Sequence, residues 1–139
     1  MKQSQSKKEN PKATILIVED HDALRGSLKT WLSSVLQGCN VLQAKSGEEA
    51  LDRVFAQAPD LVLIDVVLPG MNGIEVTRRI KDVNPKTLVV MLSIYEDPAY
   101  QADAFAVGAS AYVLKRKMGT ELIPVINSIL YNHILTAPE

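Results

Sequence analysis

The chain has 139 residues, of which 47% are hydrophobic, so it can bury one sizeable core and a single domain is expected. Its 15 basic and 16 acidic residues nearly cancel, which excludes strong bulk attraction to nucleic acid or anionic lipid. The start is polar, and no apolar run approaches the ~18 residues of a membrane span, so we expect a cytoplasmic protein without membrane contact. The single cysteine, Cys39, is expected to be a buried thiol.

Short apolar runs rich in β-branched residues recur along the chain after a polar start. Residues 1–12 have a composition typical of a flexible arm. The run at residues 13–18 shows no alternation, which is typical of a strand covered on both faces. Similar runs, of which the first is the weakest, lie at residues 40–43, 61–64, 88–92 and 111–114.

Segments of helical period separate these strands. Asp22 is the expected N-cap of the first helix, and Ser46 with Glu49 forms a capping-box pattern for the second. Gly108 is expected to end the fourth helix in a left-handed conformation. In chain order, the apolar positions of the five helices fall within residues 24–35, 50–54, 74–80, 98–107 and 122–130.

Five strands that alternate with five helices predict the α/β class, with one doubly wound parallel sheet and helices on both of its faces. The ligand site of such a sheet lies beyond the carboxyl ends of the strands. Strongly polar residues follow four of the predicted strands at that edge: Glu19 and Asp20, Asp65, Ser93, and Lys115. A single acid at a strand end is commonly a helix cap, but four matching positions favour one shared crevice.

The residue types in this crevice suit a metal ion and a phosphoryl group. Three carboxylates that lie close together resist ionisation unless a cation neutralises them, and oxygen ligands without Cys suit Mg²⁺. His21 is adjacent but is expected to lie in the loop. A lysine and a hydroxyl can hold a phosphoryl group in line with an attacking carboxylate, for which Asp65 is the best candidate.

The segments around these residues are specific enough to suggest a family. They are Glu19-Asp20, Asp65 followed by Val-Val-Leu-Pro-Gly-Met-Asn-Gly, Ser93, and Tyr-Val-Leu-Lys ending at Lys115. Together they resemble the receiver domains of bacterial two-component response regulators, over residues 13–131. The resemblance implies a flavodoxin-like sheet of five strands and leaves residues 132–139 as a C-terminal tail or the start of a linker.

The same resemblance implies a signalling role. A phosphohistidine on a partner sensor histidine kinase would pass its phosphoryl group to Asp65 in a phosphorelay. Asp20, Asp65 and the backbone carbonyl of Val67 would hold Mg²⁺, and Glu19 would act through a bound water.

The resemblance also assigns a switch and an output. Ser93 would donate its hydroxyl to the phosphoryl group, Lys115 would pair with it, and Tyr112 would change rotamer. The responsive surface, and a possible homodimer contact, would be the helix at residues 98–107, the strand at 111–114 and the last helix. The residues of these motifs are similar to those of NarL/FixJ-type transcription regulators. The resemblance implies that DNA would be bound only by an output domain that is absent from this chain.

Departures from the family pattern keep other functions open. Glu19 replaces the more usual Asp, and Arg116 replaces the proline that often follows the lysine, so no cis peptide is expected there. Val67 stands where haloacid-dehalogenase-type phosphatases need a second Asp, so we expect no turnover enzyme. The alternative is a pseudo-receiver, an interaction module with this fold that is not phosphorylated.

Overall fold

The computed structural model describes the backbone of residues 13–136 and the side chains of residues 13–132. The predicted N-terminal arm and the last three residues of the predicted tail lie outside the described residues. Strands and helices alternate as the sequence predicts. They are β1 (Thr14–Val18), α2 (Asp22–Val35), β2 (Asn40–Ala44), α3 (Gly47–Gln57), β3 (Leu61–Asp65), α4 (Gly73–Val83), β4 (Leu88–Ser93), α5 (Pro98–Ala106), β5 (Ala111–Leu114), the 3₁₀ turn η1 (Lys115–Lys117) and α6 (Met118–Thr136).

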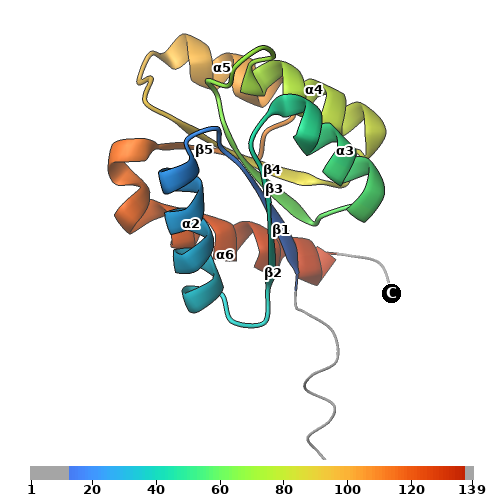
Figure 1. Cartoon of the computed structure of the whole chain (residues 1–139), viewed down its shortest axis with the longest axis vertical. Helices are drawn as coiled ribbons and strands as arrows, with labels where there is room; N and C mark the ends of the chain where they lie inside the picture. The colour runs from blue at the N-terminus through green and yellow to red at the C-terminus, as the bar shows by residue number, and fades with distance from the viewer. Residues whose placement is uncertain (1–12, 137–139) are drawn as a thin grey trace, which may run out of the picture.

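The five strands form one parallel sheet in the order β2-β1-β3-β4-β5 (Figure 1). The predicted doubly wound fold is therefore confirmed. The chain leaves β1 toward β2 on one side and later returns to β3 on the other, so the strand order reverses between β1 and β3. The crevice at such a switch point opens at the carboxyl ends of the strands.

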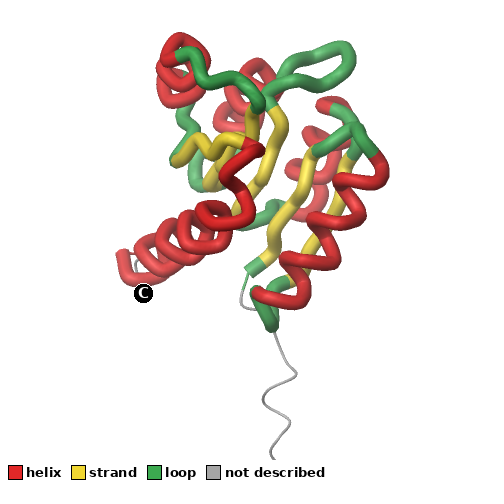
Figure 2. Tube along the Cα trace, turned by 90° about the vertical axis from the view of Figure 1, so that its left-hand side faces the viewer, coloured by secondary structure: helices red, strands yellow, loops and turns green. Residues whose placement is uncertain are grey.

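Helices cover both faces of the sheet. Figure 1 shows α3, α4 and α5 on one side, and α2 and α6 on the other, and Figure 2 shows the sheet between these two layers. Every residue of β3 is buried, because this central strand faces a helix layer on each side. This explains why its sequence is a continuous apolar run rather than an alternation. No helix among the described residues is both long and apolar enough to cross a membrane.

The helix ends follow the predicted chemistry with one exception. Ser46 accepts a hydrogen bond from the Glu49 N–H at the start of α3, and Gly108 follows α5 with φ of +106°. The N-cap of α2 is His21 rather than Asp22, which is the first helical residue and pairs instead with Arg25. The Asp22 prediction was wrong because the His21 N–H is held by the Glu19 carboxylate, which places the helix start one residue earlier.

The connection from β5 to α6 departs from the proline-containing pattern. No cis peptide bond occurs among the described residues, as expected from Arg116 in place of proline. Lys115 begins a short 3₁₀ turn instead, and α6 follows directly from Met118. Lys115 is therefore held at the end of β5, beside the carboxyl ends of the other strands.

Candidate functional site

Three strands bring charged groups together at the carboxyl edge of the sheet. The Lys115 Nζ lies 2.6 Å from Asp65 Oδ2 and 3.1 Å from Glu19 Oε1. Glu19 is 1% exposed and Asp65 is 6% exposed, so both carboxylates are removed from bulk water. We call Glu19, Asp20, Asp65 and Lys115 the acidic site.

The charged groups of the acidic site shift one another's pKa. Burial raises the pKa of the Glu19 carboxyl above its usual range, although hydrogen bonds from the His21 N–H and from Lys115 act in the opposite direction. Burial alone would lower the pKa of Lys115, but its hydrogen bonds to Asp65 and Glu19 outweigh this effect and the pKa is raised. The lysine therefore stays charged. Its single positive charge faces two carboxylates, so the site can still attract a further cation.

Both oxygens of the Asp65 carboxylate have defined partners. Its Oδ1 accepts the Val67 N–H at 3.0 Å, and its Oδ2 accepts Lys115. Val67 itself is 47% exposed, so this residue lies at the solvent edge of the site. Asp20 is exposed at the same edge. The carboxylate of Asp65 is thus fixed in orientation within a largely buried site, and Asp20 and Val67 form the solvent edge of that site.

The loop after β3 is shaped by a close backbone approach. A Cβ at position 73 would lie 2.1 Å from the Asp65 carbonyl oxygen, so only glycine fits there. The Gly73 N–H donates to the Val66 carbonyl at 2.7 Å, which closes the loop into the start of α4. This contact holds the backbone of Asp65 in place.

Ser93 and Tyr112 are connected through the loop between β4 and α5. Ser93 is fully buried at the end of β4, and its Oγ accepts the Tyr95 N–H at 2.9 Å. The Tyr112 hydroxyl donates to the Tyr95 carbonyl at 2.8 Å. The Tyr95 ring stacks on Tyr100 of α5 with centroids 4.3 Å apart. A continuous set of contacts therefore leads from Ser93, at the carboxyl end of β4, to α5.

Sequence reasoning missed several residues of this region. The Tyr95–Tyr100 stack spans a loop of no regular period, so no local pattern indicates it. The Arg25 guanidinium donates to the Glu19 carbonyl at 2.8 Å and thereby fixes the turn that carries the acids. Its spacing from Asp22 was the only available signal, because charges three residues apart share a helix face.

The donor set fits Mg²⁺. Carboxylate oxygens of Glu19, Asp20 and Asp65 gather at one edge of the sheet, and Mg²⁺ prefers oxygen ligands and retains several waters. The raised pKa of Glu19 shows that burial makes its charged form unfavourable, and a nearby cation would offset that cost. Receiver domains as a family bind Mg²⁺ at an acidic pocket of this kind.

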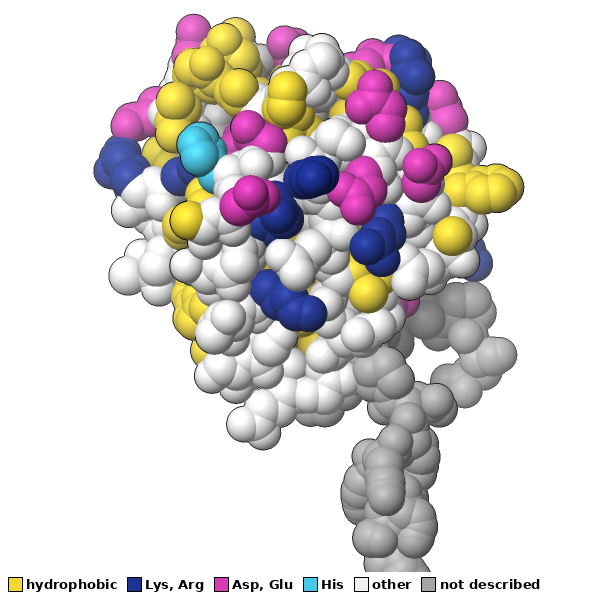
Figure 3. Space-filling model, in the orientation of Figure 1, with side chains coloured by type: hydrophobic (Ala, Val, Ile, Leu, Met, Phe, Trp, Pro, Cys, Tyr) yellow, Lys and Arg dark blue, Asp and Glu magenta, His cyan; other side chains and the backbone are white. Residues whose placement is uncertain are grey.

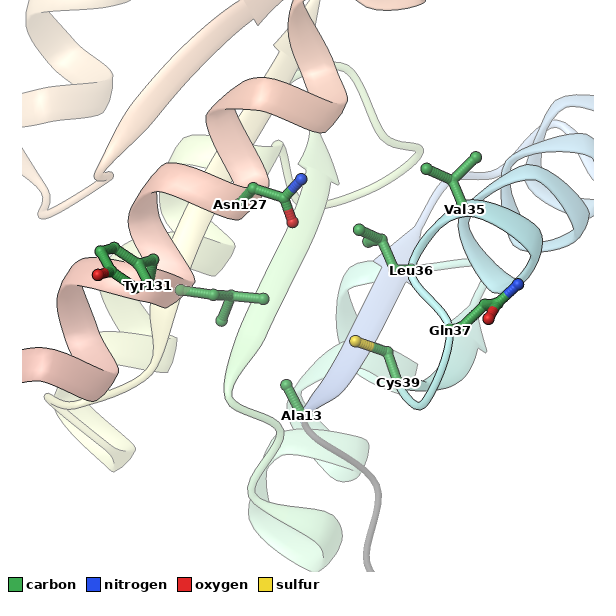
Figure 4. Close-up of a pocket in the computed structure, with 8 residues that line it drawn as sticks. Ala13, Val35, Leu36, Gln37, Cys39, Asn127 and Tyr131 are labelled. Carbon is green, nitrogen blue, oxygen red and sulfur yellow. The ribbon is translucent and has the colours of Figure 1, made fainter. Parts of the chain in front are cut away.

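A hollow lies at the opposite end of the sheet from the acidic site. A cavity of about 440 Å³ is lined by the end of α2, the residue before β1 and one face of α6 (Figure 4). Cys39 lies in its wall and is partly exposed, so the expectation of a buried thiol was wrong. Figure 3 shows acidic and basic side chains interspersed on the visible face, without a large field of one sign.

Comparisons with known proteins agree with this geometry. A family profile described as the response regulator receiver domain matches residues 15–127. The transcriptional activator protein ExaE of Pseudomonas putida is 34% identical, over 86% of this chain and 56% of that protein. A cyclic di-GMP phosphodiesterase of Thermotoga maritima is 37% identical, over 79% of this chain and 28% of that protein. The chain thus spans little more than half of one of these relatives and less than a third of the other.

A solved structure gives the same result. The two-component response regulator of the LuxR family from Aurantimonas sp. SI85-9A1 superposes with a TM-score of 0.82 at 31% identity, over 86% of each chain. The sequence match, the sheet order and the contacts of Asp65 agree, and receiver domains are generally not enzymes in their own right. This chain belongs to the response regulator receiver domain family.

Proposed function

We propose that Asp65 accepts a phosphoryl group from the phosphohistidine of a sensor histidine kinase in the cytoplasm. The bond between the imidazole nitrogen and phosphorus breaks as a bond forms between an Asp65 carboxylate oxygen and phosphorus, giving an acyl phosphate. The observation that carries the proposal is the 2.6 Å contact between Asp65 and Lys115, because this lysine can stay beside the added negative charge.

The metal ligands proposed are Asp20, Asp65 and the backbone carbonyl of Val67, with Glu19 acting through a water. When bound, Mg²⁺ supplies positive charge that stabilises the transferring phosphoryl group. The residues of the chain orient the acceptor: the Val67 N–H binds one oxygen of the Asp65 carboxylate, Lys115 binds the other, and together they limit its rotation. Water then attacks the phosphorus of the acyl phosphate, the bond between phosphorus and the Asp65 oxygen breaks, and inorganic phosphate leaves with the Asp65 carboxylate restored. An apolar Val67 with a bulky Tyr95 favours slow hydrolysis.

The switch proposed uses the contacts of Ser93. When its hydroxyl turns to a phosphoryl oxygen, it ceases to accept the Tyr95 N–H, and the loop between β4 and α5 moves. Tyr112, which holds the Tyr95 carbonyl, changes rotamer with the loop. The surface of α5, β5 and α6 then changes, and Phe105 on α5 is already 49% exposed there. A homodimer through this surface, and regulation of transcription by a following output domain, complete the proposal.

Acetyl phosphate or phosphoramidate tests the proposal without the kinase. The chain is incubated with either donor and Mg²⁺, and intact mass is measured for wild type, Asp65→Asn and Asp60→Asn. Asp60 is an exposed carboxylate at the opposite end of β3, which makes it a matched control. We expect one Mg²⁺-dependent phosphoryl adduct in wild type and Asp60→Asn, and none in Asp65→Asn. If wild type stays unmodified, the pseudo-receiver alternative is favoured instead.

A further inference from the structure

One edge of the sheet is a strand whose outer side is unpaired. β2 stands first in the strand order and pairs only with β1 among the described residues. Figure 1 shows β2 at the front of the molecule, between α2 and α3. An edge strand presents backbone N–H and C=O groups that can pair with another extended chain.

The pairing of β2 with β1 identifies the backbone groups that face outward. The Asn40 N–H and the Ala44 carbonyl are both hydrogen-bonded to residues that flank β1. In a parallel pair, the two backbone groups of one residue point to the same side, and the side alternates along the strand. Val41 and Gln43 therefore direct their N–H and C=O groups away from β1. The Lys29 ammonium donates to the Val41 carbonyl at 3.3 Å, as this direction requires.

Basic side chains surround this outer side of β2. They come from α2, from the residue after β2 and from α3: Arg25, Lys29, Lys45 and Arg53. Figure 3, in the orientation of Figure 1, shows basic side chains gathered over the strand with acidic ones beside them. A hollow of about 260 Å³ at the carboxyl end of β2 is lined by three of these bases and by Gln43. We call Val41, Gln43 and the four bases the β2 edge.

Two bases of the β2 edge already hold carboxylates of the chain itself. Arg25 Nη2 lies 2.6 Å from Asp22 Oδ1, and Arg53 Nη2 lies 3.9 Å from Glu49 Oε2. The side chains of these acids are 84% and 39% exposed, so a carboxylate from outside can reach the same guanidinium groups. Four bases against two contacting acids leave the β2 edge positively charged. Complementary charge calls for an acidic partner.

We propose that the β2 edge binds an extended acidic peptide segment of a partner protein, which adds to the sheet as a further strand. Main-chain hydrogen bonds to Val41 and Gln43 hold the segment, and its carboxylates pair with Lys45 and Arg53. A peptide N–H replaces the Lys29 ammonium at the Val41 carbonyl and frees this lysine to bind a carboxylate. The inference does not depend on the proposed phosphorylation.

Other occupants fit the β2 edge less well. A second copy would bring the same bases to both sides of the contact, and like charges that face each other are destabilising. Residues 1–12 are rich in lysine and meet the same repulsion. A nucleic acid would neutralise the bases, but it has no main-chain amides to pair with Val41 and Gln43. An acidic peptide satisfies both the charge and the backbone groups.

Fluorescence anisotropy with a labelled synthetic peptide of alternating Glu and Val tests the proposal. A second peptide has the same sequence but carries a methyl group on every backbone nitrogen, so it keeps the charge and cannot donate main-chain hydrogen bonds. We expect saturable binding of the first peptide and binding at least about 10-fold weaker for the second, because its partners on β2 stay unpaired.

Substitutions in the chain test the same contacts from the other side. Gln43→Pro removes an outward N–H and is tolerated because that N–H takes no part in the pairing with β1, whereas Gln43→Val keeps it. We expect Gln43→Pro to weaken the first peptide by at least about 10-fold and Gln43→Val to stay within about 2-fold of wild type. Lys45→Glu should weaken it by at least about 3-fold, and Lys86→Glu, which reverses an exposed lysine before β4, should not.

Several outcomes overturn the inference. They are no saturable binding of the first peptide, equal binding of the methylated one, or an unchanged affinity in Gln43→Pro. An oligothymidylate that binds more tightly than the peptide would assign the β2 edge to nucleic acid, and a dimer in sedimentation that Gln43→Pro abolishes would assign it to a second copy. Thermal unfolding checks each variant. If Gln43→Pro does not fold, the methylated peptide still decides whether backbone pairing holds the ligand.

Discussion

Glu19 shows how a single side chain can weaken the fold that positions it. Its carboxyl is 1% exposed and burial raises its pKa, so the folded state binds a proton more tightly than the unfolded state does. Stability is then lost as the pH rises from the ordinary value of 4.5 through the raised pKa of the folded state. Without added metal, we expect Glu19→Gln to unfold at a higher temperature than wild type at pH 8.

The pH dependence of this difference in melting temperature distinguishes an effect of the Glu19 charge from an effect of the altered side-chain shape. Below the ordinary pKa, Glu19 is protonated in both states and resembles Gln, so the two melting temperatures should converge. Glu49→Gln is a suitable control, because Glu49 also lies near a helix start but its carboxylate is much more exposed. A melting temperature of Glu19→Gln at or below that of wild type at pH 8 would show that the contact with Lys115 outweighs the cost of burial.

At the scale of the elements, the loop between β3 and α4 has the least freedom. A methyl group at Gly73 would lie 2.1 Å from the Asp65 carbonyl oxygen, whereas one at Gly119 in the first turn of α6 meets no atom within 4 Å. We expect Gly73→Ala to lower the free energy of unfolding by about 1–3 kcal/mol through overpacking, and to reduce phosphoryl acceptance because Asp65 shifts. Gly119→Ala should be neutral or stabilising by up to about 1 kcal/mol. Urea unfolding of both variants measures the difference.

The elements themselves were largely predictable, and their connections were less so. Strands such as β3 are continuous apolar runs because both faces are covered, and the residues at their ends could be assigned to one edge of the sheet. The start of α2 was misplaced because it depends on a hydrogen bond from His21 to the buried Glu19 carboxylate, a contact that propensity does not describe. The stack of Tyr95 on Tyr100 depends on the path of a loop and has no sequence period.

At the scale of the whole molecule, one sheet is shared by two apolar layers. Ile80 of α4 and Ile126 of α6 are both fully buried, in the clusters on opposite faces. Trp31, the single tryptophan, packs against the cluster that contains Ile126. Because both layers need the same strands, we expect Ile80→Ala and Ile126→Ala each to cost about 2–5 kcal/mol in one cooperative transition.

Trp31 fluorescence and far-ultraviolet circular dichroism measure that cooperativity together. Ile80→Ala should lower the fluorescence midpoint as far as the circular dichroism midpoint, although Trp31 lies across the sheet from the substitution. Two separated midpoints in Ile80→Ala would mean instead that the two helix layers unfold independently.

The place of Lys115 late in the sequence also determines when the acidic site can form during folding. The lysine follows the last strand, yet it contacts Glu19, which follows the first strand, and Asp65, which ends the third. Parallel pairing of such distant segments is slow, and during synthesis the acids leave the ribosome well before their lysine. If Asp65 is the acceptor as proposed, a nascent or misassembled copy lacks the cation beside it. Phosphorylation is then confined to finished molecules, and the sensor kinase does not pass its signal to copies that cannot transmit it.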